Sequence, residues 1–507
     1  EWRYVSETDW NFLNAASAST NGISFVPENP RTIEVRTVSR SGQRGGPVTV
    51  VVPIDTTVPL EPVVELRDAE GTVISPGAWA GSAVSVSVYG GDKPPGSAPV
   101  DYYEFQFVSS TSAADEALDG LTADPDAWET FDSSEPLTLE PQVDGTLFGA
   151  LFARTVDKAG NRSDARKAAV RIDTNPPPMP VVNLAAPDAE VGNLNWYKGE
   201  VDFEIVLPDD QANRAPIDPG SARYLYTYGT EGSGWQNGTT GTVPAVAGNY
   251  TLIVTVATVA GIESLPRTVQ FGIDLTPPTE PAIHAVFDSG QVPLGTDDES
   301  RVWTNQPAIA IVPGQDQGTA QSGVGPDGTW YRLAQEGEDI GTKPWSPLPP
   351  DLEDVQDGKL IVQAKTVDEV GNESAVTEGH LYIDRIAPDA PGIAFNPSGW
   401  TNGDVTVTLQ EPAVAADESP IAKMLYRFIP ADGSDPDPEW VDYSGPVDLS
   451  AHGWIEAKAI DEAGNESVTA TAEVLVDTTV GSSFPVPVVR SVQPRDLDSG
   501  QATVEIV

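Results

Sequence analysis

The phrase ARTVDKAGNRS, residues 153–163, decides how this chain is organised, because it recurs. Close copies are AKTVDEVGNES at residues 364–374 and AKAIDEAGNES at residues 457–467, and degenerate copies start at Val254 (VTVATVAGIES) and Val35 (VRTVSRSGQR). Each copy is followed by a short apolar run ending in an aspartate: Asp55, Asp173, Asp274, Asp384 and Asp477. These aspartates recur at intervals of 93 to 118 residues, the size of a domain rather than of a solenoid unit.

The segments upstream of each phrase alternate apolar and polar residues and are bounded by turn residues. One tryptophan precedes the first alternating segment and a second follows an aromatic segment; the pairs are Trp79/Trp128, Trp196/Trp235, Trp303/Trp345 and Trp400/Trp440. About seven such strands in roughly a hundred residues predict an antiparallel sandwich. The only helical candidate is one turn within residues 112–121. The sequence therefore predicts an all-β fold, a tandem array of immunoglobulin-like antiparallel β-sandwich domains.

Proline-rich joints follow the closing aspartates and set the expected boundaries. Proline fixes φ and cannot donate to a sheet ladder, so each joint should end a strand and form a short, stiff connector. The expected repeats are repeat 1 (1–57, lacking its first two strands), repeat 2 (58–175), repeat 3 (176–276), repeat 4 (277–386), repeat 5 (387–479) and repeat 6 (480–507, opening strands only). With each repeat about 25–40 Å long, they should form a semi-rigid rod.

The D-x-A-G-N-x-S part of the phrase predicts a tight hairpin turn. Its glycines, Gly160, Gly371 and Gly464, sit where positive φ is expected. Its aspartates (Asp157, Asp368, Asp461) can accept bonds from loop amides, and its asparagines (Asn161, Asn372, Asn465) tolerate turn geometry. The alternative is a cation site, although one carboxylate per turn falls short of the six to eight oxygens that calcium takes. Repeat 3 has Thr258, Ala260 and Ile262 in this turn and should lack any such site.

The unit from VDxAGNxS to IDTTPP resembles the bacterial immunoglobulin-like repeats of large secreted and surface proteins, which are also similar to fibronectin type III modules. The resemblance covers nearly the whole chain. It implies the architecture but not the function, because such modules occur in adhesins, appendages and secreted glycan-active enzymes alike.

The formal charge of −48, from 76 acidic and 28 basic residues, argues against nucleic acid or anionic lipid as partners. It also favours solubility and attraction of divalent cations. No apolar run is long enough to span a membrane, so no membrane insertion is expected. Cysteine is absent, which excludes disulfides and fits a bacterial protein with an extracellular or cell-surface location.

Residues capable of chemistry are few. His284, His380 and His452 lie in separate repeats, and no nucleophile elbow, zinc or nucleotide-binding motif occurs. We therefore predict no enzyme activity and no catalytic, cofactor-binding or metal-binding residues, and no cofactor beyond a weak affinity for calcium. The acidic stretches at 296–301, 351–357 and 432–439 are expected to be solvated loops, with weak calcium binding as the alternative.

Three further expectations concern side chains and chain ends. Lys365 and Lys458 should point outward, since Arg154, Arg36 and Thr255 hold the same position elsewhere, which disfavours a lysine isopeptide bond. The tryptophans should fill cores or joints rather than form sugar platforms. Both ends fall inside repeats, which indicates either a longer chain or head-to-tail self-assembly in which residues 485–507 complete residues 1–55 of a neighbour.

The predicted function is a structural stalk or spacer of a large bacterial extracellular protein, or part of a fibre, whose main partners are other repeats of the same chain. One alternative is an adhesin that binds a glycan or protein ligand, with the aromatic segment Arg223–Thr239 as the best site. The other is an accessory region of a secreted carbohydrate-active enzyme.

Overall fold

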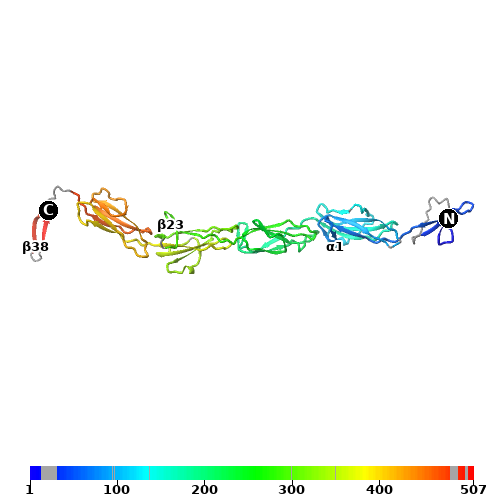
Figure 1. Ribbon diagram of the computed structural model, residues 1–507, viewed down its shortest axis with the longest axis horizontal. Helices are drawn as coiled ribbons and strands as arrows, with labels where there is room; N and C mark the ends of the chain where they lie inside the picture. The colour runs from blue at the N-terminus through cyan, green and yellow to red at the C-terminus, as the bar shows by residue number, and fades with distance from the viewer. Residues whose placement is uncertain are drawn as a thin grey trace. The chain divides into compact units, whose positions relative to one another are not determined.

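The computed structural model describes residues 1–12, 31–93, 95, 97–135, 137–297, 300–348, 350–479, 489–496 and 501–506. Nearly all regular structure in these residues is antiparallel β-sheet, which confirms the predicted all-β sandwich class (Figure 1). The chain divides into two compact units, Glu1–Asp274 and Leu275–Val507. No helix among the described residues has both the length and the apolar character needed to cross a membrane.

The first unit begins with a three-stranded sheet in residues 1–57, of order β1-β2-β3. Its strands are β1 (Trp2–Tyr4), β2 (Arg31–Val35) and β3 (Val48–Val52).

Residues 58–175 form two facing sheets, of order β10-β7-β4-β5 and β6-β12-β11-β8-β9. Their elements are β4 (Pro62–Arg67), β5 (Val73–Ile74), β6 (Trp79–Ala80), β7 (Val84–Gly90), β8 (Val100–Ser110), α1 (Asp115–Asp119), β9 (Glu129–Phe131), β10 (Leu137–Leu139), β11 (Thr146–Asp157) and β12 (Arg166–Asp173). The five-residue α1 confirms the single helical turn expected there. It packs Leu118 against Phe148, so β11 is buried on both faces.

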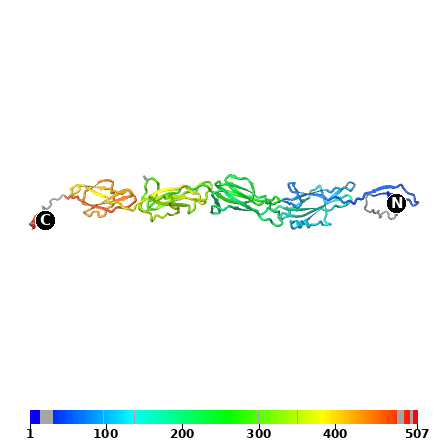
Figure 2. The ribbon, with the colours of Figure 1, turned by 90° about the horizontal axis from the view of Figure 1, so that it is seen from below.

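Residues 176–276, drawn in green in Figure 2, repeat this two-sheet plan. One sheet has the order β13-β16-β20, and the other β14-β15-β22-β21-β17-β18, with β19 also on β17. The strands are β13 (Val181–Leu184), β14 (Ala189–Val191), β15 (Leu194–Tyr197), β16 (Val201–Val206), β17 (Arg223–Tyr228), β18 (Glu231–Gly232), β19 (Gln236–Asn237), β20 (Thr240–Val243), β21 (Gly248–Thr255) and β22 (Arg267–Ile273).

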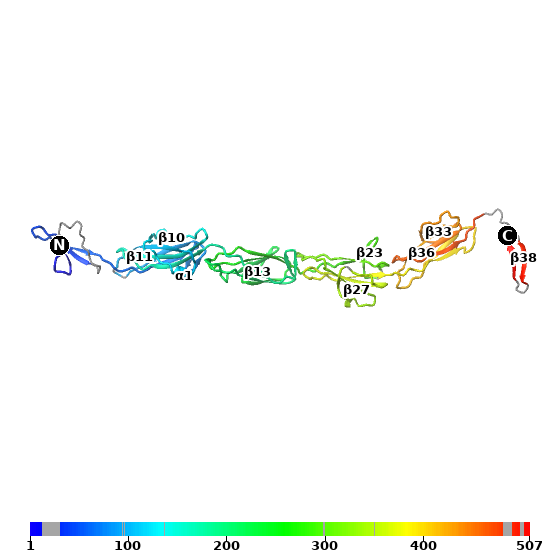
Figure 3. The same ribbon diagram turned by 180° about the vertical axis from the view of Figure 1, so that it is seen from behind.

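The second unit holds two further sandwiches, several of whose strands are labelled in Figure 3. Residues 277–386 pair as β24-β23-β26 and β25-β30-β29-β27-β28, and residues 387–479 as β31-β32-β35 and β34-β33-β36-β37. The first set is β23 (Ala282–Phe287), β24 (Gly290–Pro293), β25 (Trp303–Thr304), β26 (Ile309–Val312), β27 (Thr329–Gln335), η1 (Ile340–Thr342), β28 (Ser346–Pro347), β29 (Gly358–Thr366) and β30 (Thr377–Ile383). The second set is β31 (Gly392–Asn396), β32 (Val405–Gln410), β33 (Ile421–Pro430), β34 (Val441–Asp442), β35 (Val447–Leu449), β36 (Gly453–Asp461) and β37 (Ala470–Val474).

Two more strands, β38 (Val489–Asp496) and β39 (Gln501–Ile506), pair only with each other among the described residues. Repeat 6 was expected to supply opening strands here. Head-to-tail pairing was predicted for residues 485–507, which lie partly outside the described residues, and that assembly stays a prediction.

Each sandwich encloses its own apolar cluster. Alternation along a strand turns every second side chain inward, so in β16 Val201, Phe203 and Ile205 are buried while the intervening residues are exposed. Four clusters are built within residues 64–172, 182–273, 283–383 and 393–476 respectively. Separate interiors of this size, each closed by two sheets, are what a tandem sandwich array requires.

Candidate functional site at the joints between repeats

The repeated phrase forms the predicted hairpin turn. Gly160, Gly371 and Gly464 have φ of 85°, 86° and 90°, a conformation that costs a residue with a Cβ energy. In repeat 2, Asp157 Oδ1 accepts hydrogen bonds from the amides of Ala159 (2.8 Å) and Asn161 (2.9 Å). The role expected for the aspartates as acceptors of loop amides is therefore confirmed.

The asparagine of the phrase does more than tolerate a turn. Its side-chain amide donates to the second carboxylate oxygen of the phrase aspartate, at 2.9 Å for Asn161–Asp157, 2.8 Å for Asn372–Asp368 and 2.9 Å for Asn465–Asp461. These aspartates are 2%, 5% and 3% exposed, so the bonds satisfy carboxylates that water scarcely reaches. Asp and Asn thus form one hydrogen-bonded unit around a buried carboxylate.

The serine that ends the phrase is a residue whose role sequence reasoning missed. Its hydroxyl accepts the backbone N–H of the residue eight positions earlier, in Ser163–Thr155, Ser264–Val256, Ser374–Thr366 and Ser467–Ala459, at 2.9 to 3.2 Å. The bond ties the start of the returning strand to the end of the preceding one. The signal was the invariance of this serine in all four of these copies.

The closing aspartates connect one repeat to the next. In each of three joints inside a compact unit, a carboxylate Oδ2 accepts a backbone N–H from the following repeat. The pairs are Asp55–Ala98 (2.6 Å), Asp173–Ala215 (2.8 Å) and Asp384–Ser419 (2.7 Å). Asp173 and Asp384 are 0% and 2% exposed. A buried charge-assisted bond of this kind fixes the distance between the last strand of one sandwich and a loop of the next.

The phrase asparagine takes part in two of these joints. Asn161 Nδ2 also donates to the backbone carbonyl of Asp55 (2.9 Å), and Asn465 Nδ2 donates to that of Asp384 (3.0 Å). The turn of the following repeat therefore forms a hydrogen bond with the closing residue of the preceding one. The repeated phrase is a docking element as well as a hairpin.

Apolar and backbone contacts complete the joint between repeats 4 and 5. Ala463 packs in one cluster with Trp303 and Tyr382, all less than 8% exposed. Asn305 N donates to Ala463 O, and Asn305 Nδ2 to Asn465 Oδ1, both at 3.1 Å.

The joint between repeats 2 and 3 includes a close contact at Gly81. A Cβ at this position would lie 2.4 Å from the carbonyl oxygen of Ala260, so only glycine fits there.

A basic side chain occupies two of the joints. Lys93 Nζ contacts Asp55 Oδ2 at 2.9 Å and also Asp157 Oδ2, and its side chain is 4% exposed. Burial raises the pKa of Asp157, but the Lys93 ammonium and Asn161 outweigh it and hold this pKa below its usual value. The amide of Ala98, followed by Lys93, lowers the pKa of Asp55.

At the joint between repeats 2 and 3, Arg214 takes the basic role. Its Nε lies 2.9 Å from Asp173 Oδ2. Burial opposes ionisation of Asp173, but the Ala215 amide, Asn175 and Arg214 together lower its pKa. Repeat 3 brings no second carboxylate at this turn, because Thr258 stands where repeats 2, 4 and 5 have aspartate.

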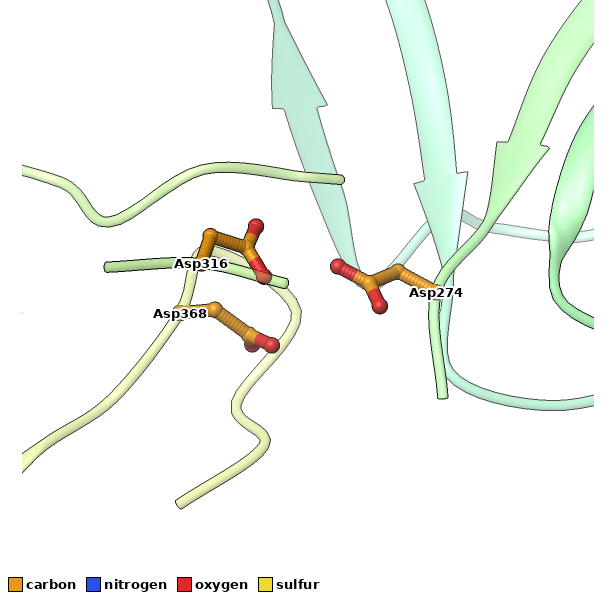
Figure 4. Close-up of side chains that lie close together, drawn as sticks. All are labelled: Asp274, Asp316 and Asp368. Atoms are coloured by element: carbon orange, nitrogen blue, oxygen red, sulfur yellow. The ribbon is translucent and has the colours of Figure 1, made fainter. Parts of the chain in front are cut away.

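Repeat 4 brings together two carboxylates whose proximity was not predicted from the sequence. Oxygen atoms of Asp316 and Asp368 lie within 4.8 Å of each other, and Figure 4 shows both side chains. Asp316 Oδ2 also accepts the amide of Gly323 at 2.5 Å. Sequence reasoning counted one carboxylate per turn and missed Asp316, which belongs to a loop about fifty residues earlier.

The tryptophans are only partly as expected. Trp196 and Trp303 are buried, but Trp400 is 62% exposed. The second tryptophans are not core residues: each lies beneath a cation, in the pairs Arg154–Trp128, Arg223–Trp235, Arg332–Trp345 and Arg427–Trp440, at 3.9 to 4.9 Å from the ring centroid. The prediction of core or joint plugs is wrong for them. Lys365 and Lys458 lie over Trp345 and Trp440 on this outer side, where the cation–π contact and a nearby glutamate hold them.

The segment Arg223–Thr239 offers a poor platform for sugars. Tyr224 is 6% exposed and Tyr226 packs against the same core. Trp235 is 46% exposed, but the Arg223 guanidinium, held by Glu263, covers a face of its ring. A sugar that stacks on this face would have to displace an ion-paired arginine.

The histidines form no shared site. His380 Nε2 contacts Glu378 Oε1 (3.1 Å) and His452 Nδ1 contacts the carbonyl of Val474 (2.8 Å), while His284 lies in β23. A groove of about 930 Å³ in the second unit is lined in part by Asp288, Asp351 and Glu353. These acids are exposed, whereas acid–base catalysis near neutral pH relies on carboxyl groups tuned by burial.

No family model matches the chain, and no curated protein matches it. Similar solved structures include the FN1–FN3 domains of chicken CNTN1, at 12% identity and a TM-score of 0.25, covering 59% of this chain and 98% of that one. A tetra-tandem repeat from the extending region of a large adhesion protein has 13% identity and a TM-score of 0.25, covering 89% and 96%. A Ca²⁺-stabilized adhesin with which an Antarctic bacterium binds ice has 15% identity and a TM-score of 0.25, covering 83% and 100%.

These structures are fibronectin type III modules and tandem repeats of adhesion proteins, the kind of module that the sequence resembles. TM-scores of this size say nothing about ligands or partners of this chain.

Proposed function

We propose that the chain is a structural spacer of a large extracellular or cell-surface protein, in which repeats 2 to 5 are domains with the boundaries given above. The observation that carries the proposal is the bond from three closing aspartates, Asp55, Asp173 and Asp384, to an amide of the next repeat. A spacer keeps its ends apart only if its joints resist bending, and buried bonds across short proline connectors provide that resistance. Its function is mechanical and non-enzymatic.

Small-angle scattering of the whole chain tests the proposal. Five repeats in series should give a radius of gyration above about 40 Å, against about 23 Å for a compact protein of this length. A value near the compact figure would contradict the spacer function. The variant Asp384→Ala should scatter with a broader distribution of end-to-end distances than wild type, while the surface variant Asp435→Ala should not.

We also propose that the carboxylates of Asp316 and Asp368 take a divalent cation such as calcium. Two carboxylates side by side are suitable oxygen ligands, with water completing the shell. The loop from Pro313 to Gly323 contains no lysine or arginine, whereas the corresponding loop of repeat 2 carries Lys93. The melting temperature of wild type should fall when EDTA replaces calcium. In Asp316→Asn the melting temperature should be the same in both buffers, and an unchanged wild-type value would refute calcium binding.

A further inference from the structure

We propose that Lys93 is a tethered cation that holds the joint between repeats 1 and 2 in place of a divalent metal ion. Its ammonium group lies between Asp55 and Asp157, two carboxylates contributed by different repeats. The side chains of Lys93 and Asp157 are 4% and 0% exposed, and that of Asp55 is 16% exposed. The joint therefore contains two negative charges and one built-in positive charge.

The two carboxylates are held by other donors as well. Asp55 accepts the amides of Thr57 and Ala98, and Asp157 accepts those of Ala159 and Asn161. Asn161 Nδ2 links the Asp157 carboxylate to the Asp55 carbonyl. Without Lys93, these bonds would keep two carboxylates close together, which is unfavourable unless another cation enters. Carboxylate oxygens are the ligands that calcium prefers.

The joint between repeats 2 and 3 provides a natural contrast. Arg214 faces the single carboxylate of Asp173, and the phrase position is Thr258. Removing Arg214 would leave one carboxylate, too few to retain a divalent cation. Whether a joint can respond to metal therefore depends on two features. One is the number of carboxylates that meet there, and the other is whether the loop before β8 or β17 supplies a basic side chain that neutralises them.

The test is hydrogen–deuterium exchange of the whole chain, read at the amides of Ala98 and of residues 157–163, in EDTA and in 5 mM calcium chloride, a concentration of about millimolar order suited to weak sites. Wild type should exchange equally in both buffers. In Lys93→Ser, these amides should exchange at least about tenfold faster in EDTA, and calcium should return them to within about threefold of wild type. Because the readout is local, the result is independent of calcium at Asp316 and Asp368.

Three variants control the interpretation. Lys93→Arg should keep wild-type exchange in EDTA, which shows that the charge matters. Lys93→Ser combined with Asp157→Asn should show no calcium response. Arg214→Ser should speed the exchange of the Ala215 amide in both buffers alike. The proposal is overturned if Lys93→Ser exchanges like wild type in EDTA, or if calcium leaves its faster exchange unchanged.

Discussion

The turn of repeat 3 and the turn of repeat 5 have the same backbone but different side chains. In repeat 3, Thr258 N donates to Ile262 O at 3.0 Å and Gly261 has φ of 79°. In repeat 5, Asp461 N donates to Asn465 O at 3.1 Å around a glycine of the same conformation. The hairpin therefore forms without Asp and Asn. What repeat 3 lacks is the asparagine bond to the preceding closing residue, so the Asp–Asn pair serves the joint and the glycine and serine serve the turn.

The largest expected effect is a difference in stability between variants of the two turns. Asp461→Ala removes the acceptor of both Asn465 donors in a site that is 3% exposed, and should reduce the free energy of opening of the β36 amides by about 3 kcal/mol. Thr258→Ala removes only one bond of 3.3 Å to Ile262 and should cost less than about 1 kcal/mol. Native-state hydrogen exchange measures both values. Equal costs would show that the aspartate is no more than a turn residue.

A smaller effect should be shared by both kinds of turn. Ser264→Ala and Ser467→Ala each leave a buried backbone N–H without its acceptor, and each should cost about 1–2 kcal/mol. The same exchange experiment measures these values on β21 and β36. A cost in repeat 5 alone would show that the serine, too, belongs to the joint.

Acidification should leave the melting temperature unchanged near neutral pH and lower it only at clearly acidic pH. The folded-state pKa values of Asp157 and Asp173 are lowered, so their contribution to stability is complete above the ordinary carboxyl pKa and is lost as pH falls through the lowered values. We expect an unchanged melting temperature between about pH 7 and 5 and a decline below about pH 4. A melting temperature that rises on acidification would contradict the pairing of both carboxylates.

Local features of this fold could be predicted from the sequence, and long-range ones could not. Alternation along β16, the positive φ of Gly371 and the short helix α1 depend on neighbouring residues, and sequence reasoning found each of them. The bond from Asn161 to Asp55 spans 106 residues, and that from Asn465 to Asp384 spans 81. Nothing in the local sequence distinguishes an asparagine that binds the preceding repeat from one that only stabilises its own turn.

The contacts of the second tryptophans and of Lys93 could not be predicted from the sequence for a related reason. A tryptophan is expected in the core on size alone, but Trp128, which directly precedes β9, lies beneath the guanidinium of Arg154 in β11. Lys93 reads as one more surface charge until Asp55 and Asp157 come together around it. The sequence does hold one signal: the loop before β8 in repeat 2 carries a lysine, the loop before β17 in repeat 3 carries an arginine, and the loop before β27 in repeat 4 carries neither.

The most direct test of hydrogen-bonded joints is the exchange rate of one amide, that of Ser419. This residue is 1% exposed and donates to the Asp384 carboxylate of the preceding repeat. In Asp384→Ala we predict that the Ser419 amide exchanges at least about tenfold faster while the β33 and β36 amides keep their wild-type rates. Unchanged exchange at Ser419 would contradict the account, as would equal acceleration throughout repeat 5.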